Sequence, residues 1–86
     1  MFFVRYTEDG SSYIYYVHDE IKNEKTGDIC YILEWCHTTE EQIRNTDNMF
    51  DLYDKCDGTM WVLFKRGAKF YTFNDYEVNI EVINKE

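Results

Sequence analysis

The chain has 86 residues, enough for one hydrophobic core and too few for two, so we expect a single domain over residues 1–86. Seventeen acidic residues against nine Lys and Arg give a net charge of −8, which disfavours direct binding to nucleic acid and to anionic membranes. No apolar run approaches the roughly 20 residues that span a bilayer, and the first ten residues do not resemble a secretory signal, so we expect neither a membrane segment nor a leader.

Three strands are predicted in the first part of the chain. Phe2 to Thr7 and Ser12 to His18 alternate aromatic and β-branched residues, and the dipeptide Asp9-Gly10 between them is a strong hairpin signal because both residues tolerate a positive φ. Residues 19–28 are mostly polar and predict a connecting loop. The run from Ile29 to Cys36 then predicts a third strand.

The segment from Thr39 to Asp57 is predicted to form one amphipathic helix. At about 100° per residue, its apolar side chains fall on one half of the helix and its charged side chains on the other. The apolar half comprises Ile43, Thr46, Met49, Phe50, Leu52, Tyr53 and Cys56. Thr38 or Thr39 can cap the first turn, and Gly58 follows as a left-handed stop.

Three more strands are predicted after this helix, over residues 59–65, 69–74 and 77–83, with a tight turn at Arg66 to Ala68. The order of elements is then βββαβββ. The simplest packing is an α+β fold, a mostly antiparallel twisted β-sheet with the one amphipathic helix packed across one face.

The helix is expected to pack on the sheet through Met49, Phe50 and Tyr53. Their expected partners are Leu33 or Trp35 on the third strand and at least one of Val78, Ile80 and Val82 on the last strand. Truncation of Phe50 to Ala would then cost about 3–5 kcal/mol of stability.

The cysteines at positions 30, 36 and 56 are expected to be free thiols. Their number is odd, which is typical of a reducing compartment, and Cys30 and Cys36 on one strand would lie roughly 20 Å apart, beyond disulfide reach. We therefore predict a cytoplasmic protein.

No catalytic or metal-binding motif stands out. Cys36 and His37 are neighbours on a strand and would point to opposite faces, and no Cys-x-x-Cys pair completes a zinc site. Asp51, Asp54 and Asp57 are three residues apart, whereas a calcium loop needs ligands at every second residue. We expect no enzyme activity, no cofactor and no metal site, and a thiol or metal enzyme using Cys36 and His37 is the least favoured alternative.

The acidic half of the predicted helix is the candidate binding surface. Its partner-binding residues are Glu40, Glu41, Asp47, Asp51 and Asp54. A row of carboxylates suits a basic protein partner, such as a nuclease or another nucleic-acid-binding protein, and the alternative is an ordinary solvated surface. A secondary interface is predicted at Tyr13, Tyr15 and Tyr16, because tyrosine is common at protein interfaces.

In size, acidity and aromatic content the chain resembles the inhibitors that phages make against host defence systems, such as anti-CRISPR and anti-restriction proteins that mimic nucleic acid. It is similar in the same way to immunity proteins that neutralise nuclease toxins. The resemblance is one of character and covers no aligned residues. It implies a non-enzymatic inhibitor that occupies a basic groove in the host cytoplasm. An alternative of a different class is a homodimeric structural or adaptor domain, with Tyr13 to His18 and Ile29 to Cys36 at the dimer interface.

Overall fold

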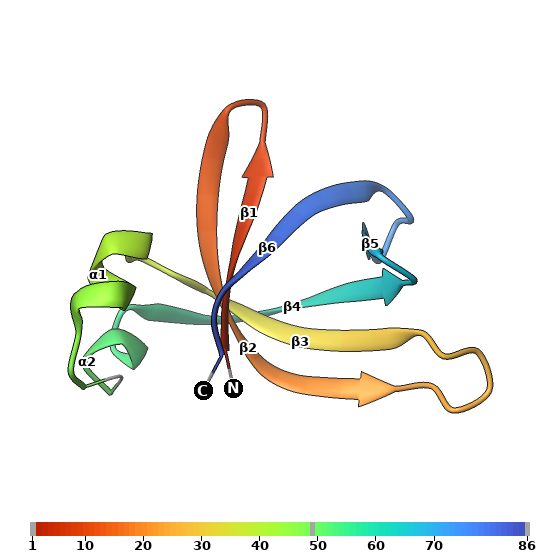
Figure 1. Cartoon of the computed structure of the whole chain (residues 1–86), viewed down its shortest axis with the longest axis horizontal. Helices are drawn as coiled ribbons and strands as arrows, with labels where there is room; N and C mark the ends of the chain where they lie inside the picture. Colours follow the sequence, from red (N-terminus) through yellow and green to blue (C-terminus); the bar gives the residue numbers. More distant parts are fainter. Residues whose placement is uncertain (1, 49, 86) are drawn as a thin grey trace.

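The computed structural model describes residues 2–48 and 50–85 and shows a closed barrel of antiparallel strands. The six strands in these residues are β1 (Phe2–Glu8), β2 (Ser11–Lys22), β3 (Ile29–Cys36), β4 (Cys56–Arg66), β5 (Lys69–Thr72) and β6 (Glu77–Lys85). Two short helices, α1 (Glu40–Asn45) and α2 (Phe50–Tyr53), lie between β3 and β4. Each strand pairs with its neighbours in sequence, and β1 also pairs with β6, so the two ends of the described chain lie side by side (Figure 1).

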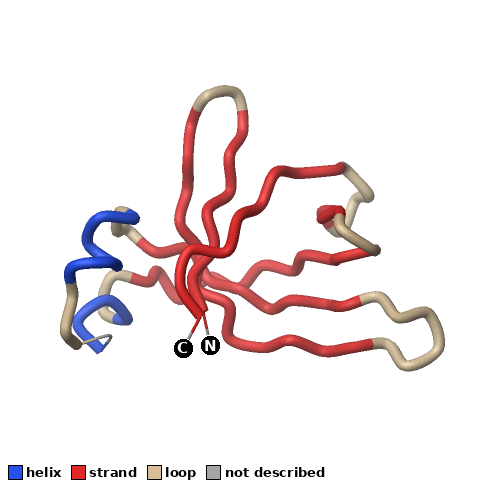
Figure 2. Tube along the Cα trace, viewed as in Figure 1, coloured by secondary structure: helices blue, strands red, loops and turns tan. Residues whose placement is uncertain are grey.

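The predicted α+β fold, an open sheet with a helix across one face, is wrong. β1 is hydrogen-bonded on both sides, to β2 and to β6, so the sheet has no free edge at its first strand and closes on itself. The interior is filled by apolar side chains from the strands themselves, and therefore no helix is needed to cover it. Figure 2 shows strands through most of the chain and the two helices confined to one end.

The local strand signals are confirmed. Glu8 pairs with Ser11 across the first hairpin, and Asp9 and Gly10 have φ of 49° and 81°, as a two-residue turn of the primed type requires. The second predicted hairpin is also present, with Arg66 paired to Lys69. The predicted loop at residues 19–28 is shorter than expected, because β2 continues to Lys22 and pairs with β3 along that extension.

Two separate clusters of buried side chains form the core. The first fills the inside of the barrel and contains Phe2, Val4, Val17, Tyr31, Leu33 and Leu63. The second lies outside the barrel wall, where the helices cover β1, β2 and β3, and contains Phe3, Ile14, Tyr16, Cys36, Ile43 and Leu52. Alternation along β1 explains the division, since Phe2 and Val4 point inward while Phe3 points outward under the helices. The helices thus seal part of the outer wall.

The predicted single helix over Thr39 to Asp57 is wrong, although its start is confirmed by a capping box between Thr39 and Gln42. Its two ends must meet, because the Cα atoms of Cys36 and Cys56 are only 4.0 Å apart in paired strands. A straight helix of this length would extend about 28 Å and could not return. The chain instead turns at Thr46 and Asn48, where the Asn48 N–H donates to Thr46 Oγ1 at 3.3 Å.

The apolar residues of this segment are therefore placed differently from the prediction. Ile43 and Leu52 are 2% and 3% exposed and contact the outer wall, whereas Phe50 is 74% exposed. The expected packing of Phe50 and Tyr53 on Leu33 and on Val78 or Ile80 is wrong, because these three residues belong to the cluster inside the barrel, whereas Tyr53 packs against the second cluster outside it. The part of that prediction that concerned Met49 falls outside the described residues.

The prediction of three free thiols is also wrong. Cys36 and Cys56 form a disulfide between β3 and β4, and Cys30 is the free cysteine of the described chain. The disulfide therefore removes the argument for a reducing compartment that rested on free thiols. Within residues 2–48 and 50–85, no helix has the length and apolar character needed to cross a membrane.

Candidate functional site

Glu40, the first of the predicted partner-binding carboxylates, is engaged within the chain. Its Oε2 accepts a hydrogen bond from Arg5 Nη1 at 2.7 Å and its Oε1 accepts one from Arg44 Nη2 at 2.5 Å. Arg5 lies on β1 and also pairs with Glu81 on β6. Glu40 thus ties α1 to the barrel wall, and its charge is offset before any partner arrives.

The other four predicted carboxylates lie on the exposed side of the segment that contains both helices, which we call the α1–α2 segment (residues 40–54). They are Glu41, Asp47, Asp51 and Asp54. Among the described residues none of them has an ion-pair partner. The break between the helices means that they do not form the straight row predicted from the sequence.

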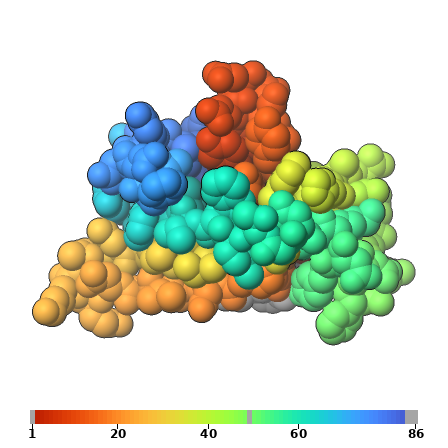
Figure 3. Space-filling model, turned by 180° about the vertical axis from the view of Figure 1, so that it is seen from behind, coloured from red at the N-terminus to blue at the C-terminus, as the bar shows by residue number. Residues whose placement is uncertain are grey.

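An exposed aromatic ring accompanies these carboxylates. Phe50 begins α2, next to Asp51, and its ring meets the edge of Tyr53 with centroids 5.6 Å apart and planes at 89°. Figure 3 shows the α1–α2 segment, in green, projecting at one end of the molecule. The segment therefore presents an accessible apolar ring among unpaired carboxylates.

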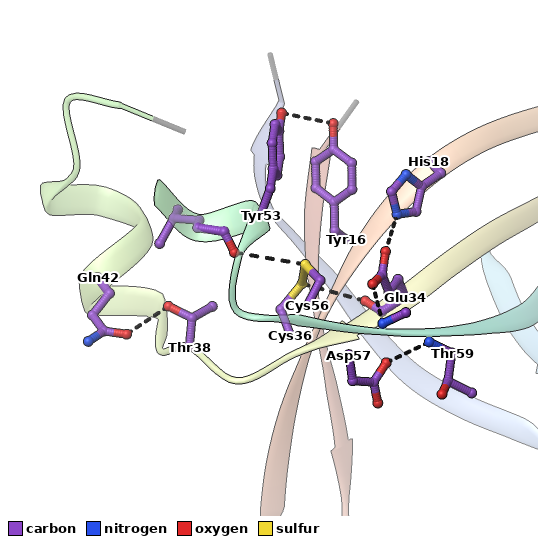
Figure 4. Close-up of a disulfide and its surroundings, with 12 residues drawn as sticks. Tyr16, His18, Glu34, Cys36, Thr38, Gln42, Tyr53, Cys56, Asp57 and Thr59 are labelled. Atoms are coloured by element: carbon purple, nitrogen blue, oxygen red, sulfur yellow. Dashed lines mark hydrogen bonds and ion pairs between the residues drawn. A yellow bond between two sulfur atoms is a disulfide. The ribbon is translucent and has the colours of Figure 1, made fainter. Parts of the chain in front are cut away.

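The three tyrosines predicted as a secondary interface do not share a face. Tyr16 is buried outside the barrel wall, and its hydroxyl lies 3.2 Å from the hydroxyl of Tyr53 (Figure 4). Tyr13 and Tyr15 point the other way and line a cavity of about 330 Å³ at one end of the barrel. Alternation along β2 separates them, as it does in any strand.

Sequence reasoning missed the rest of this cavity, which we call the barrel-mouth cavity. Tyr6 and Glu8 line it from β1, and Trp61 lines it from β4. The Tyr6 ring centroid lies 6.2 Å from that of Tyr13 and 6.2 Å from that of Tyr15. The alternation of β1 and β2 would have placed the tyrosines on one face, but only barrel closure brings Trp61 to them.

Nearby carboxylates make the cavity electronegative. Burial and a hydrogen bond of 2.8 Å from its hydroxyl to Glu8 Oε2 raise the pKa of Tyr6 to about 12, and the charge of Asp9 adds to this. Burial also raises the pKa of Tyr15, with contributions from Tyr13, Asp57 and Glu8. Burial disfavours a phenolate whatever its surroundings, and the nearby carboxylates disfavour it further while they favour a cation.

A buried carboxylate lies beside the disulfide, where β3 and β4 change register. Glu34 is 8% exposed, its Oε1 lies 2.6 Å from His18 Nε2, and its Oε2 accepts the N–H of Gly58 (Figure 4). Asp57, Gly58 and Thr59 lie opposite Trp35 alone, and this bulge is why Gly58 has a φ of 82° within a strand and does not end a helix. Both oxygens of Glu34 are satisfied, so the group secures the bulge.

Cys36 and His37, the pair considered for thiol or metal chemistry, are both engaged in other contacts. Cys36 is oxidised in the disulfide, and the ring of His37 packs on Trp35 with centroids 4.2 Å apart. Among the described residues, no group of three His, Cys, Asp or Glu side chains is placed to hold a metal ion.

Comparisons with protein-family models, curated proteins and solved structures find no match to this chain.

Proposed function

We propose that this protein is a small, acidic, non-enzymatic inhibitor that binds the basic nucleic-acid-binding groove of a nuclease or another nucleic-acid-binding protein. The observation that carries the proposal is the exposed Phe50 ring among the unpaired carboxylates of the α1–α2 segment. Protein interfaces are commonly anchored by an aromatic side chain surrounded by polar contacts. A net charge of −8 also steers such a chain toward a basic groove and away from nucleic acid itself.

The proposed action is competition. Carboxylates of the segment would lie where a nucleic acid presents phosphates, and Phe50 would occupy an apolar contact in the groove. A phage anti-defence protein and an immunity protein against a nuclease toxin both fit this description. The sequence-based argument for the cytoplasm rested on free thiols and is removed by the disulfide, so a cytoplasmic location is part of this proposal. The state of the Cys36–Cys56 bridge in cells, measured by alkylation before lysis, tests that location.

The decisive experiment compares two charge-reversed variants. One carries Asp47→Lys, Asp51→Lys and Asp54→Lys, and the other carries Asp19→Lys, Glu20→Lys and Glu24→Lys at exposed positions of β2 and the following loop. Each substitution adds two charges, so both variants go from −8 to −2. The two variants therefore differ only in where the charge is reversed.

The partner is first captured from the source cells with the tagged parent protein, and labelled DNA or RNA is then bound to it. The parent should displace the nucleic acid, the β2 variant should retain most of this ability, and the α1–α2 variant should lose it. Phe50→Ala should weaken competition without lowering the melting temperature, whereas the exposed control Phe73→Ala should leave competition unchanged. Equal competition by both charge variants would contradict the assignment of the α1–α2 segment, and a captured partner without affinity for nucleic acid would contradict the function.

A second candidate function, self-association, is favoured by a different surface. Apolar residues of β2, β3 and β4 form a patch on the outer wall that the helices leave uncovered. The patch contains Ile21, Ile32, Met60, Val62 and Phe64. Cross-strand pairing places Ile32 beside Val62, and both point away from the barrel interior that Leu33 and Leu63 fill.

Dimerisation through this patch differs from the dimer interface predicted from the sequence. The inner faces of Tyr13 to His18 and Ile29 to Cys36 are used by the barrel itself, so only the outer side of β3 remains for a second copy. Sedimentation equilibrium over a range of concentration and salt tests this alternative. A dimer that is lost in Val62→Asp would support it, and a monomer at all concentrations would exclude it.

A further inference from the structure

The barrel-mouth cavity combines aromatic walls with negative charge. Its volume of about 330 Å³ falls at the small end of the range for ligand sites. Tyr6 and Glu8 enter from β1, Tyr13 and Tyr15 from β2, and Trp61 from β4. In Figure 3 the tip of the β1–β2 hairpin, in red, stands above β4, which carries Trp61.

The rings are arranged as walls. The planes of Tyr6 and Tyr15 lie at 83° to each other and those of Tyr6 and Tyr13 at 46°, with both pairs of centroids 6.2 Å apart. At these angles and distances the edge of one ring covers part of the face of the other, and the faces not covered in this way can meet a ligand in the cavity that the rings line. The Trp61 residue is 49% exposed and can meet that ligand without first breaking a packed core.

The negative charge around the cavity favours a cationic ligand. The negative face of an aromatic ring attracts a cation, and the Glu8 carboxylate adds to that field from the cavity rim. Burial is the main cause of the raised pKa values of Tyr6 and Tyr15, and the charges of Glu8 and of further carboxylates raise them more, in keeping with a negative field at these rings. An anionic ligand would meet repulsion at the same place.

We propose that the barrel-mouth cavity binds an alkylated ammonium group, held by the faces of Tyr6, Tyr13, Tyr15 and Trp61 and by the charge of Glu8. This site is distinct from the α1–α2 segment and does not depend on the partner proposed for it. Two sources supply the group, a methylated lysine of another protein and a free quaternary amine.

An alkylated ammonium group differs from an unmodified lysine or arginine side chain in the number of N–H donors that it brings into the cavity. A primary ammonium brings three N–H donors and a guanidinium five, and each donor needs an acceptor once it is buried. Glu8 Oε2 already accepts the Tyr6 hydroxyl, and Thr72 Oγ1 already accepts the N–H of Tyr76 at 3.2 Å. Glu8 Oε1 and the phenol oxygens of Tyr13 and Tyr15 are then the side-chain acceptors left in the lining, fewer than the five donors of a guanidinium. The remaining walls are mostly aromatic or aliphatic. A trimethylammonium group carries positive charge without N–H donors and leaves none unsatisfied.

The first test uses choline and its neutral isostere 3,3-dimethylbutan-1-ol. Binding is followed by NMR through the indole N–H signals of the two tryptophans, of which Trp61 lines the cavity and Trp35 does not. Choline should shift the Trp61 signal in a saturable way and leave the Trp35 signal in place. The isostere has the same shape without the charge, and it should bind at least about tenfold more weakly.

Matched variants locate the site. Trp61→Ala and Glu8→Gln should each weaken choline binding, the first followed through the tyrosine ring signals, while Phe73→Ala at an exposed position outside the cavity should not change it. Melting curves of all three variants establish that each is folded. Binding of choline that is unchanged in both Trp61→Ala and Glu8→Gln would overturn the site.

A second arm separates the two sources. A peptide with trimethyllysine that binds more tightly than choline, and more tightly than the same peptide with unmodified lysine, identifies a protein-borne group. Choline binding at least as tightly as that peptide identifies a free quaternary amine. Equal binding of choline and its isostere, or of the modified and unmodified peptides, overturns the proposal. None of these outcomes depends on nucleic-acid competition, so the inhibitor function and this site can fail separately.

Discussion

Reduction of the Cys36–Cys56 disulfide should lower the stability of this protein substantially. The bridge closes a loop with a sequence separation of 20, and in the chain-entropy model a loop of that size contributes about 3 kcal/mol. A domain of this length is stable by roughly 4–13 kcal/mol, so the loss is a large share of the total. At about 4–8 °C per kcal/mol for a domain of this size, the melting temperature should fall by about 12–24 °C.

The structure adds a reason for the size of this effect. The bridge joins the two points where the α1–α2 segment leaves and rejoins the barrel, and the same ends are held by one backbone bond from His37 N to Lys55 O at 2.7 Å. The second core cluster depends on that segment, because Ile43 and Leu52 belong to it. Reduction therefore frees the segment that covers the outer wall.

The assay compares thermal unfolding by circular dichroism for protein refolded with and without reductant. Mass spectrometry after alkylation counts the thiols, which should be one in the oxidised protein and three in the reduced protein. A double variant, Cys36→Ala with Cys56→Ala, should melt low and not respond to reductant, whereas Cys30→Ala should still respond. Equal melting temperatures for fully oxidised and fully reduced protein would refute the structural role of the bridge.

Two further expectations follow from burial and charge. Ile43→Ala, at a 2% exposed position, should lower the free energy of unfolding by about 2–5 kcal/mol, as measured by chemical denaturation. Phe50→Ala, at a 74% exposed position, should change it by less than about 0.5 kcal/mol. A larger loss of stability in Phe50→Ala than in Ile43→Ala would support the single-helix interpretation instead. The phenol of Tyr6 should titrate near pH 12, seen as the difference in absorbance at 295 nm between the parent and Tyr6→Phe. Because this pKa is raised above its unfolded value of 10.0, the stabilising contribution of Tyr6 is complete below pH 10 and is lost as the pH rises toward 12. Titration of Tyr6 near pH 10 in the folded protein would contradict its burial and its hydrogen bond to Glu8.

The features that the sequence predicts correctly are local ones. A turn at Asp9-Gly10 needs only residues that accept a positive φ, and the alternation of the flanking strands needs only their own side chains. The helix start at Thr39 is equally local, because its cap and Gln42 are three residues apart. Such signals do not depend on what the rest of the chain does.

The closure of the barrel and the break in the helix are not local. The pairing of β1 with β6 joins the two ends of the described chain, and nothing in either strand alone specifies the other. The break between α1 and α2 follows from the pairing of Cys36 with Cys56. The odd number of cysteines in the sequence favoured free thiols and so gave no reason to expect this pairing. A periodic pattern of apolar residues over Thr39 to Asp57 therefore predicted one long helix where two short ones form.

The candidate site was predictable in composition and not in arrangement. The acidic residues of the α1–α2 segment were found by counting charge, but the engagement of Glu40 by Arg5 depends on packing between α1 and β1. Tyr13 and Tyr15 were singled out as interface residues. Their partner Trp61 is far along the chain and reaches them only through the barrel.

The two proposed surfaces are mechanically separate, and this makes their tests independent. The α1–α2 segment rests on the outer wall through Ile43 and Leu52, while the barrel-mouth cavity is lined by inward-facing residues such as Tyr15 and Leu33. Substitutions at distant sites without shared partners add in free energy. Charge reversal at Asp47, Asp51 and Asp54 should therefore leave choline affinity close to that of the parent, apart from a loss of general negative field that added salt removes. Trp61→Ala should in turn leave nucleic-acid competition intact. A large effect of either change on the other surface would show that the protein has one binding site, extending from the barrel mouth to the helices.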